Sequence, residues 1–283
     1  MGQNLENGSA QKIKFFAAYN KQAHIFRSEV FQPIFNGAID FELEADALRD
    51  NTGLNISDKN INYGELTGHY WVWKNFLSTT SVDYIGFCQF HRFLDFNITQ
   101  SDKMPYFKIP EKEFKKMFKK YSEKNILKCI EGYEVVLSHK VLFKESVYEH
   151  YIKYHPQKDL DLALNILEEI YPQYVNSGQE FMSGNQMHMF GCFVMKKECF
   201  NNYMTWLFDI LTVLEQRTDW KDYDNYNLRT PAFIAERFLN IWLQHKIKTE
   251  NLQVLTTTSV MLDDSLKTHL KTLLRKIINF FIP

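Results

Sequence analysis

Several features are missing from this sequence, and each absence excludes a class of protein. The formal net charge is only −1, so broad electrostatic binding of nucleic acid is not expected. No apolar run reaches the length that crosses a membrane, and the N-terminal "MGQNLENGSAQ" has no signal-peptide core. The four cysteines form no C-x-x-C pair and show no metal-ligand spacing with histidine, which is typical of reduced thiols inside a cell. We therefore expect a cytoplasmic protein.

The chain has enough apolar sequence for one large domain. Its 283 residues are 45% hydrophobic and 24% charged, and no internal repeat or Pro/Gly-rich linker divides them. Aromatic residues reach 16%. Two interpretations of this aromatic content are open: the rings bind the C–H faces of sugars, or they fill a phenylalanine-rich core.

Apolar runs that alternate with amphipathic segments predict an α/β fold. The apolar runs predict strands over residues 12–20, 81–90, 133–140 and 187–197. Apolar residues at helical spacing predict helices over residues 63–77, 110–130, 159–172, 196–217 and 230–246. Because helices between strands connect parallel strands, we expect a mostly parallel central sheet flanked by helices.

The two ends of the chain differ from this expected domain of residues 12–260. Residues 1–11 are polar and are expected to be disordered. Residues 261–283 combine an apolar stripe with lysine and arginine, which predicts a basic amphipathic C-terminal helix. Two interpretations are open: the helix lies on the inner face of the cytoplasmic membrane, or it packs against the domain or a partner.

A segment dense in short polar side chains precedes the first expected helix. Such side chains bond to nearby backbone and shape turns. Loops at the carboxyl ends of strands in α/β proteins also bind ligands, and amides with a carboxylate suit a ribose, a uracil edge or sugar hydroxyls. Both roles are open for Asp50, Asn51, Asn55, Ser57, Asp58 and Asn60.

The polar segment and four later segments together resemble a known family. "DNTGLNISDKNINYGELTGHYWVWKN" and "DYIGFCQFHRF" resemble the core of the bacterial capsular and exopolysaccharide biosynthesis family, once catalogued as a domain of unknown function and now grouped with glycosyltransferases. "SVYEHYIKYHPQKDLDLALNILEEIYPQY", "FGCFVMKKECFNNYMTWLFDIL" and "PAFIAERFLNIWL" resemble further family segments in the same order. The resemblance covers residues 12–246. It implies a GT-A-like transferase that uses a nucleotide sugar and builds a cell-surface glycan.

The resemblance also implies which residues contact the donor, with two departures, one of which is Gly191 or Cys192 in place of the asparagine of the family's N-M-F segment. The expected donor contacts are Asp50, Asn51, Asn55, Ser57, Lys59, Tyr63, His91, Arg92 and Arg237. Where the family usually has His-Tyr-Arg-Arg, this chain has Gln89-Phe90-His91-Arg92, so only the last position is kept in type. Arginine matches phosphate oxygens geometrically, and we expect Arg92, with His91, to offset the charge of the donor diphosphate. The alternative is an arginine that pairs with an acid of the protein.

The position where a GT-A enzyme commonly carries an Asp-x-Asp motif holds no carboxylate pair. That motif follows a central strand and holds a divalent ion on the diphosphate. The literal match, Asp222-Tyr223-Asp224, follows no expected strand, and Asp95 with Asn97 is a weaker substitute. We therefore name no metal ligand, although dependence on Mn²⁺ or Mg²⁺ stays open.

Two glutamates are candidates for the catalytic base. An inverting transferase needs a carboxylate that takes the proton of the acceptor hydroxyl. Glu236 is the first candidate and Glu65 the second. The alternatives are a surface ion pair of Glu236 with Arg237, and a sugar contact or a first-turn acid for Glu65.

Four further residues are candidates for acceptor contacts. Tyr151 and His155 are four residues apart on an expected helix and so share one face. Asn185 precedes the fourth expected strand, and His188 lies at its start. A partly buried structural pair is the alternative interpretation of Tyr151 and His155.

The family resemblance thus implies a hexosyltransferase. The expected donor is a UDP-sugar, with galactose as the first candidate. The expected acceptor is a lipid-linked or growing surface polysaccharide at the inner membrane surface. The alternative is a non-catalytic subunit with the same fold that binds a glycan or a nucleotide sugar.

Overall fold

The computed structural model describes residues 11–37, 42, 47–96, 104–265 and 268. The strands are β1 Ile13–Tyr19, β2 Phe31–Phe35, β3 Tyr84–Gln89, β4 Arg92–Leu94, β5 Tyr106–Ile109, β6 Val135–Ser138, β7 Val141–Leu142, β8 Gln186–Met187, β9 Phe193–Lys196, β10 Val254–Thr257 and β11 Ser259–Leu262. The helices are α1 Asn60–Tyr63, α2 Leu66–Trp71, α3 Glu111–Phe118, α4 Glu123–Ile130, α5 Val147–Tyr154, α6 Gln157–Ile170, α7 Val175–Ser183, α8 Lys197–Arg217 and α9 Thr230–Glu250, with a π-helical turn, Val72–Phe76, after α2.

Nine of the described strands form one central sheet. Strand β1 pairs in parallel with β2 and β3, β6 with β10, and β5 with β11. Strands β4 and β9 run antiparallel to their neighbours, so β1, β2, β3, β5, β6, β10 and β11 share one direction. The expected α/β fold with a mostly parallel sheet flanked by helices is confirmed.

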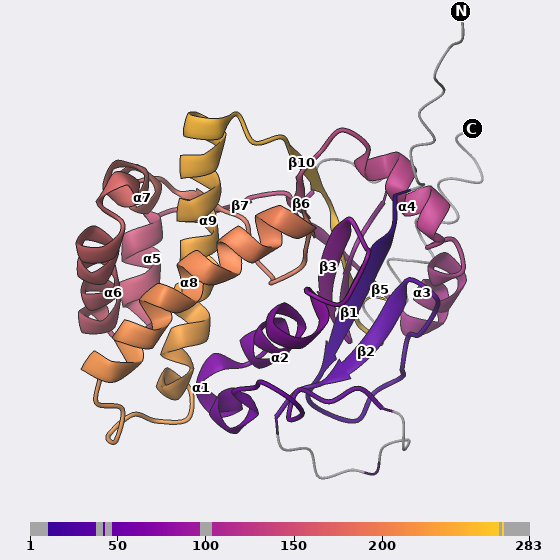
Figure 1. Ribbon diagram of the computed structural model, residues 1–283, viewed down its shortest axis with the longest axis horizontal. Helices are drawn as coiled ribbons and strands as arrows, with labels where there is room; N and C mark the ends of the chain where they lie inside the picture. Colours follow the sequence, from indigo (N-terminus) through magenta and orange to yellow (C-terminus); the bar gives the residue numbers. More distant parts are fainter. Residues whose placement is uncertain (1–10, 38–41, 43–46, 97–103, 266–267, 269–283) are drawn as a thin grey trace, which may run out of the picture.

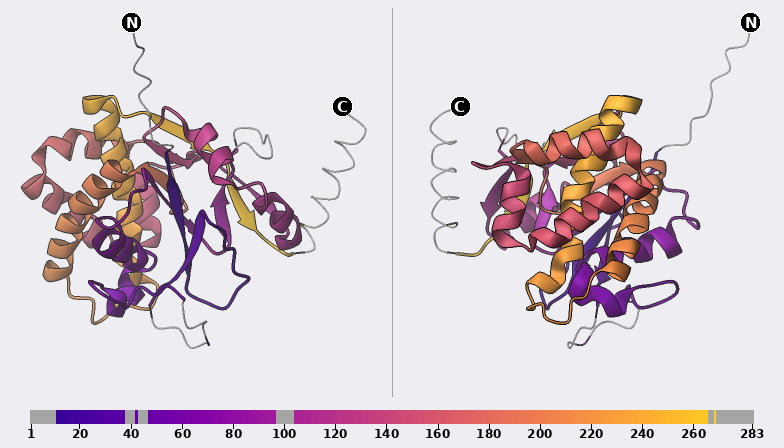
Figure 2. Two further views of the ribbon diagram at one scale, coloured as in Figure 1. Left: turned by 45° about the vertical axis from the view of Figure 1, so that its right-hand side comes forward. Right: turned by 90° about the vertical axis from the view of Figure 1, so that its left-hand side faces the viewer.

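The sheet separates two apolar layers, and successive residues of a strand enter opposite layers. Phe16 and Phe87 pack with the layer that contains α5 to α9, whereas Phe15 and Cys88 pack with the layer that contains α3 and α4. Figures 1 and 2 show α5 to α9 gathered on one side of the sheet and α3 with α4 on the other. The central strands are therefore buried on both faces, which explains why they read as continuous apolar runs.

Several expected elements differ from the observed ones. The expected helix 110–130 is two helices, because Ser122 caps a new helix by accepting a hydrogen bond from the backbone N–H of Asn125. The expected helix 63–77 is interrupted at Gly64, which adopts φ +53 between α1 and α2. The expected strand 187–197 is β8 and β9, separated by a turn in which Phe190 and Gly191 both have positive φ.

The expected boundary at residue 260 does not separate two units in the structure. Residues 259–262 form β11, which pairs with β4 and β5 in the central sheet. Residues 261 and 262 of the expected C-terminal helix are therefore strand residues, and residues 266–267 and 269–283 of it lie outside the described residues, as do residues 1–10. In the described part of the chain, no helix is both long and apolar enough to cross a membrane.

Candidate active site

A cavity of about 390 Å³ opens where β1 and β3 end. Its walls come from these strand ends, the start of α2, the turn before β9 and the first turns of α9. In α/β sheets, ligands bind at the carboxyl ends of parallel strands. Six residues for which the sequence left ligand contact or catalysis open line this one cavity: Asn60, Glu65, His91, Arg92, His188 and Glu236.

Glu65 reaches the cavity because of the sharp connection between α1 and α2. Gly64 ends α1 with its N–H bonded to the carbonyl of Asn60, and its φ of +53 is a conformation that glycine adopts at little cost. Glu65 then immediately precedes α2. Its Oε1 accepts a hydrogen bond from Gln89 Nε2 at 3.2 Å, and its Oε2 lies 3.8 Å from Arg229 Nη2.

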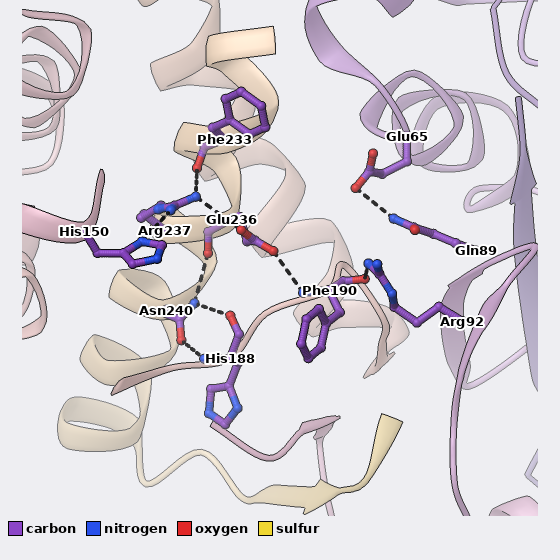
Figure 3. Close-up of polar contacts among 10 residues, drawn as sticks. All are labelled: Glu65, Gln89, Arg92, His150, His188, Phe190, Phe233, Glu236, Arg237 and Asn240. Carbon is purple, nitrogen blue, oxygen red and sulfur yellow. Dashed lines mark hydrogen bonds and ion pairs between the residues drawn. The ribbon is translucent and has the colours of Figure 1, made fainter. Parts of the chain in front are cut away.

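Glu236 lies on α9 and holds the turn before β9. Its Oε1 accepts a hydrogen bond from the backbone N–H of Phe190 at 2.9 Å, and its Oε2 lies 3.2 Å from Arg237 Nη1 (Figure 3). Phe190 has φ +84, an uncommon conformation for a bulky residue. Strained backbone of this kind persists where the surroundings fix it, and it is common at functional sites.

Arg92 holds the same turn from the opposite side. It begins β4 after a two-residue turn from β3, and its Nη1 donates to the carbonyl of Phe190 at 3.2 Å. Its guanidinium also lies 5.0 Å from the centroid of the Phe190 ring. The Nε of Arg92 and the Nδ1 of His91 are buried and have no hydrogen-bond partner among the described residues. Arg92 also brings a positive charge to the cavity wall, which suits an anionic ligand.

Asn240, one helical turn after Glu236, fixes the segment before the Phe190 turn. Its Oδ1 accepts from the backbone N–H of His188 at 2.8 Å, and its Nδ2 donates to the carbonyl of His188 at 2.9 Å (Figure 3). The ring of His188 makes a further hydrogen bond with the carbonyl of Ser138 through Nδ1 at 2.6 Å. Helix α9 thus positions His188 through Asn240 and Phe190 through Glu236.

The histidines of the cavity are neutral near pH 7. Burial lowers the pKa of His69 to about 3, and burial lowers the pKa of His188 to about 4 against the opposing effect of its backbone hydrogen bond. Burial, followed by the positive charges of Arg92 and Lys21, lowers the pKa of His91 to about 4. The charged groups of the wall are therefore two glutamates and two arginines, Glu65, Glu236, Arg92 and Arg229.

Arg237 is buried beside the cavity and is not among the residues that line it. Its side chain is 2% exposed, its Nη1 donates to the carbonyl of Phe233, and its guanidinium lies 5.2 Å from the Tyr151 ring. Figure 3 shows Arg237 directed toward His150, away from Phe190. Tyr151 is fully buried and His155 is 9% exposed, with their rings 4.8 Å apart. Donor contact by Arg237 and acceptor contact by Tyr151 stay predictions without support from the cavity lining.

The polar segment that precedes α1 is tied down by its own side chains. Asp50 is fully buried and accepts hydrogen bonds from Ser57 Oγ at 2.5 Å and from the backbone N–H of Gly37 at 3.0 Å. Asn55 donates to the carbonyl of Gly53 and accepts from the N–H of Ser57. These side chains shape the turns, which is one of the two roles left open by the sequence.

The remaining predicted contacts lie at or beyond the edge of the cavity. Lys59 Nζ and Tyr63 Oη both bond to Glu215 of α8, at 2.8 and 3.0 Å. Asn51, Asn55 and Ser57 line a separate open depression, and Asn60 lines both this depression and the cavity. Asn185 lies beside the β7–β8 pair, where its Nδ2 donates to the carbonyl of Phe143. The donor and acceptor roles of these residues stay predictions.

Among the cavity-lining residues that sequence reasoning missed are Gln89, Arg229 and Phe233. Gln89 was noted only as a departure from the family pattern. A signal for the other two was available, because residues 229, 233 and 236 follow the i, i+4, i+7 spacing that places side chains on one helix face.

The residues at the end of β3 do not fit a divalent cation. Gln89, Phe90, His91 and Arg92 offer no carboxylate there, and Arg92 brings a positive charge. Asp222 and Asp224 are exposed in the connection between α8 and α9. No cluster of three His, Cys, Asp or Glu side chains occurs within the described ranges.

Comparison with known proteins identifies related chains. A family model described as "Domain of unknown function (DUF4422)" matches residues 14–247. The comparison with curated proteins found no match. A solved apo structure titled as the bifunctional glycosyltransferase WbbM is similar, with a TM-score of 0.82 and 30% sequence identity over 90% of this chain. This chain spans 46% of that protein, about half of its length. Since the family model spans most of the sequence, including every residue that lines the cavity, the chain belongs to the DUF4422 family.

Proposed function

We propose that this protein is a glycosyltransferase that moves a hexosyl group from a nucleotide sugar to a growing cell-surface polysaccharide. The observation that carries the proposal is the cavity itself, in which two carboxylates and two arginines meet at the carboxyl ends of β1 and β3. The similarity to a bifunctional glycosyltransferase at 30% identity supports the same activity class. The donor that we propose first is a UDP-sugar, with galactose as the first candidate sugar.

The arginines would serve the leaving group. When the bond between the anomeric carbon and the diphosphate oxygen breaks, that oxygen gains negative charge. Arg92 and Arg229 both line the cavity, and the side chain of Arg229 is 46% exposed. Donors that are already oriented stabilise developing charge without the cost of reorganisation.

One of the two carboxylates would take the proton. As the acceptor oxygen bonds to the anomeric carbon, its hydroxyl proton passes to Glu236 or Glu65. Glu236 remains the first candidate, since Phe190 N–H and Arg237 fix its orientation while each of its oxygens keeps a second lone pair. Glu65 is oriented by Gln89 in the same way and is the second candidate.

Donor binding can be measured with a thermal-shift panel of UDP-, GDP-, CMP- and dTDP-sugars. A ligand that binds only the native state raises the melting temperature by mass action. We expect a UDP-sugar to give the largest increase and to release UDP when a lipid-linked saccharide is added. A panel in which no nucleotide sugar raises the melting temperature would refute the proposal.

We further propose that transfer does not depend on a divalent cation, because Arg92 stands at the end of β3 where a metal-binding carboxylate pair would be needed. Activity in EDTA should then equal activity with added Mn²⁺ or Mg²⁺. Complete loss in EDTA that Mn²⁺ restores would contradict this.

A non-catalytic binding subunit is the second candidate function. Both cavity carboxylates already accept hydrogen bonds from the protein, which a purely structural role would also explain. Donor binding without UDP release, tested with lipid-linked and polysaccharide acceptors, would favour this alternative.

The acceptor that we propose is presented at the inner face of the cytoplasmic membrane. The basic, apolar sequence of residues 269–283 supports such a contact, since it combines lysine and arginine with leucine and isoleucine. Removal of residues 269–283 should weaken binding to vesicles that contain anionic lipid. Unchanged vesicle binding would remove this part of the proposal.

A further inference from the structure

Three packed aromatic rings lead from the cavity along the start of α9, with the buried ring of His155 between the other two. We call Tyr226, His155 and Phe233 the aromatic ledge. The ring of His155 stacks on Phe233 at a centroid distance of 4.1 Å and on Tyr226 at 5.4 Å, and the Tyr226 and Phe233 rings lie 5.1 Å apart. Phe233 lines the cavity, so the inner end of the ledge belongs to the candidate active site.

The outer end of the ledge is exposed on a fixed backbone. Tyr226 is 52% exposed. The next residues are held in place, because Asp224 Oδ1 accepts from the N–H of Asn227 at 2.7 Å and Thr230 Oγ1 donates to the carbonyl of Asn227 at 2.8 Å. A ring that is already positioned loses little conformational freedom when it binds a ligand.

The chemistry of the ledge suits a sugar ring. Burial, followed by the positive charges of Arg237 and His150, lowers the pKa of His155 to about 4, so that the three rings are uncharged at neutral pH. Neutral aromatic faces pack against the C–H faces of sugars, and a tyrosine hydroxyl can bond to a sugar hydroxyl.

The position of the ledge favours the acceptor over the donor. Ala18 of β1 pairs with Gln89 of β3, and both strand ends line the cavity on the side where nucleotides bind in α/β folds. Figure 3 shows Phe233 on α9 and Gln89 on opposite sides of the site. With the nucleotide at the strand ends, the Phe233 end of the ledge lies on the α9 side of the cavity.

We propose that the aromatic ledge is a second acceptor subsite, which stacks on a sugar ring of the glycan next to the one that receives the hexose. The inference rests on the proposed function and extends it: the acceptor is an oligosaccharide, recognised over at least two sugar units.

The test measures binding of glycans of different length to the full chain without donor. The probes are mono-, di- and trisaccharides of galactose, glucose and mannose. Their binding is measured by saturation-transfer NMR and calorimetry. In at least one series, we expect the disaccharide to bind about twofold to tenfold more tightly than the monosaccharide, the range that one aromatic stacking contact provides. Tyr226→Ala should remove that preference, and Tyr226→Phe should keep most of it.

Tyr154→Ala is the matched control. Tyr154 is also 52% exposed, but it lies on α5 and its ring packs on His150 outside the ledge. The control variant should keep the length preference. The inference is overturned if the wild type shows no length preference in all three series, if the preference survives Tyr226→Ala, or if Tyr154→Ala removes it as well.

A parallel thermal-shift measurement with UDP-sugars separates the two proposals. Tyr226→Ala should keep the donor-induced shift of the wild type, and loss of that shift would place the ledge in the donor site and overturn the inference. Length-dependent glycan binding by a protein that binds no nucleotide sugar would uphold the ledge and refute the transferase.

Discussion

The Glu236 carboxylate accepts a hydrogen bond at 2.9 Å from the backbone N–H of Phe190, a residue with φ +84. Arg92 donates to the carbonyl of the same residue at 3.2 Å. The two side chains with the strongest predicted roles in chemistry therefore hold the two sides of one strained residue. A substitution at either position changes both the charge of the cavity and the support of the turn, so experiments must separate the two effects.

Glu236→Gln separates charge from support. The amide oxygen of glutamine can still accept from Phe190 N–H, so the turn is kept while the base is removed. If Glu236 takes the proton, we expect kcat to fall by about 10²-fold to 10⁴-fold, the usual contribution of general base catalysis. Steady-state kinetics and thermal melts check this, and the melting temperature should also fall, because the neutral amide leaves the buried guanidinium of Arg237 without its countercharge.

Glu236→Ala removes the acceptor as well and provides the comparison. It should lower the melting temperature further than Glu236→Gln, because the N–H of Phe190 loses its partner. Near-normal kcat in a folded Glu236→Gln protein would exclude the base assignment and move it to Glu65.

Gly191→Ala tests whether the close contact between the Phe190 turn and Glu65 matters for transfer. Gly191 has φ +61, and an added Cβ would lie 3.1 Å from Glu65 Oε1. We expect Gly191→Ala to cost about 1 to 2 kcal/mol of unfolding free energy for the positive φ and to lower kcat in addition by displacing Glu65. Denaturant unfolding measures the change in unfolding free energy, and steady-state kinetics measures kcat.

Gly132→Ala is the matched control for backbone strain. Gly132 has φ +82 with nothing within 4 Å of an added Cβ, and it does not line the cavity. It should show a similar loss of stability with unchanged kcat. Equal kcat values for the two alanine variants would mean that the contact between Gly191 and Glu65 has no role in transfer.

The central part of the fold could be predicted because its strands are buried on both faces. The apolar runs around β1, β3 and β6 are long enough to stand out, and α8 and α9 have 21 residues each. Strands β4, β5, β10 and β11 have three or four residues and are defined by pairings across the sheet. Such pairings depend on the tertiary fold and leave little local pattern.

The candidate site was predictable from the resemblance for some residues only. Glu65, Arg92 and Glu236 lie in segments that resemble the family, and all three line the cavity. Arg237 was grouped with Glu236 because they are adjacent in sequence, yet adjacent helical residues point about 100° apart, and Arg237 is buried beside Tyr151. Helical periodicity would have selected Phe233 in its place.

Ser57 distinguishes a structural role for the polar segment from donor contact. Its hydroxyl donates to the buried carboxylate of Asp50. We expect Ser57→Ala to cost about 1.5 to 3 kcal/mol of unfolding free energy, the range for a hydrogen bond to a charged group, and to keep the donor-induced thermal shift. Asn51→Ala, at an exposed residue of the same segment, should leave stability unchanged. Loss of the donor shift in Ser57→Ala at unchanged stability would show instead that Ser57 binds the donor.

The lowered pKa of His69 predicts how the free energy of unfolding depends on pH. Burial against the rings of Phe87 and Phe193 lowers the pKa of His69 from 6.5 to about 3, so below pH 6.5 the unfolded chain binds a proton that the folded protein does not. Stability is then lost as the pH falls from 7 toward 3. For this residue the loss between pH 7 and pH 5 is on the order of 2 kcal/mol.

His69→Gln removes this titration and should flatten the pH dependence. Urea unfolding of the wild type and the variant at pH 7 and pH 5 measures the effect. His24→Gln is the control, because His24 is exposed and its replacement should leave the pH dependence as in the wild type. If His69→Gln loses as much stability between pH 7 and pH 5 as the wild type does, the acid sensitivity arises from other groups, and His188 and His91, whose pKa values burial also lowers to about 4, are the next to replace.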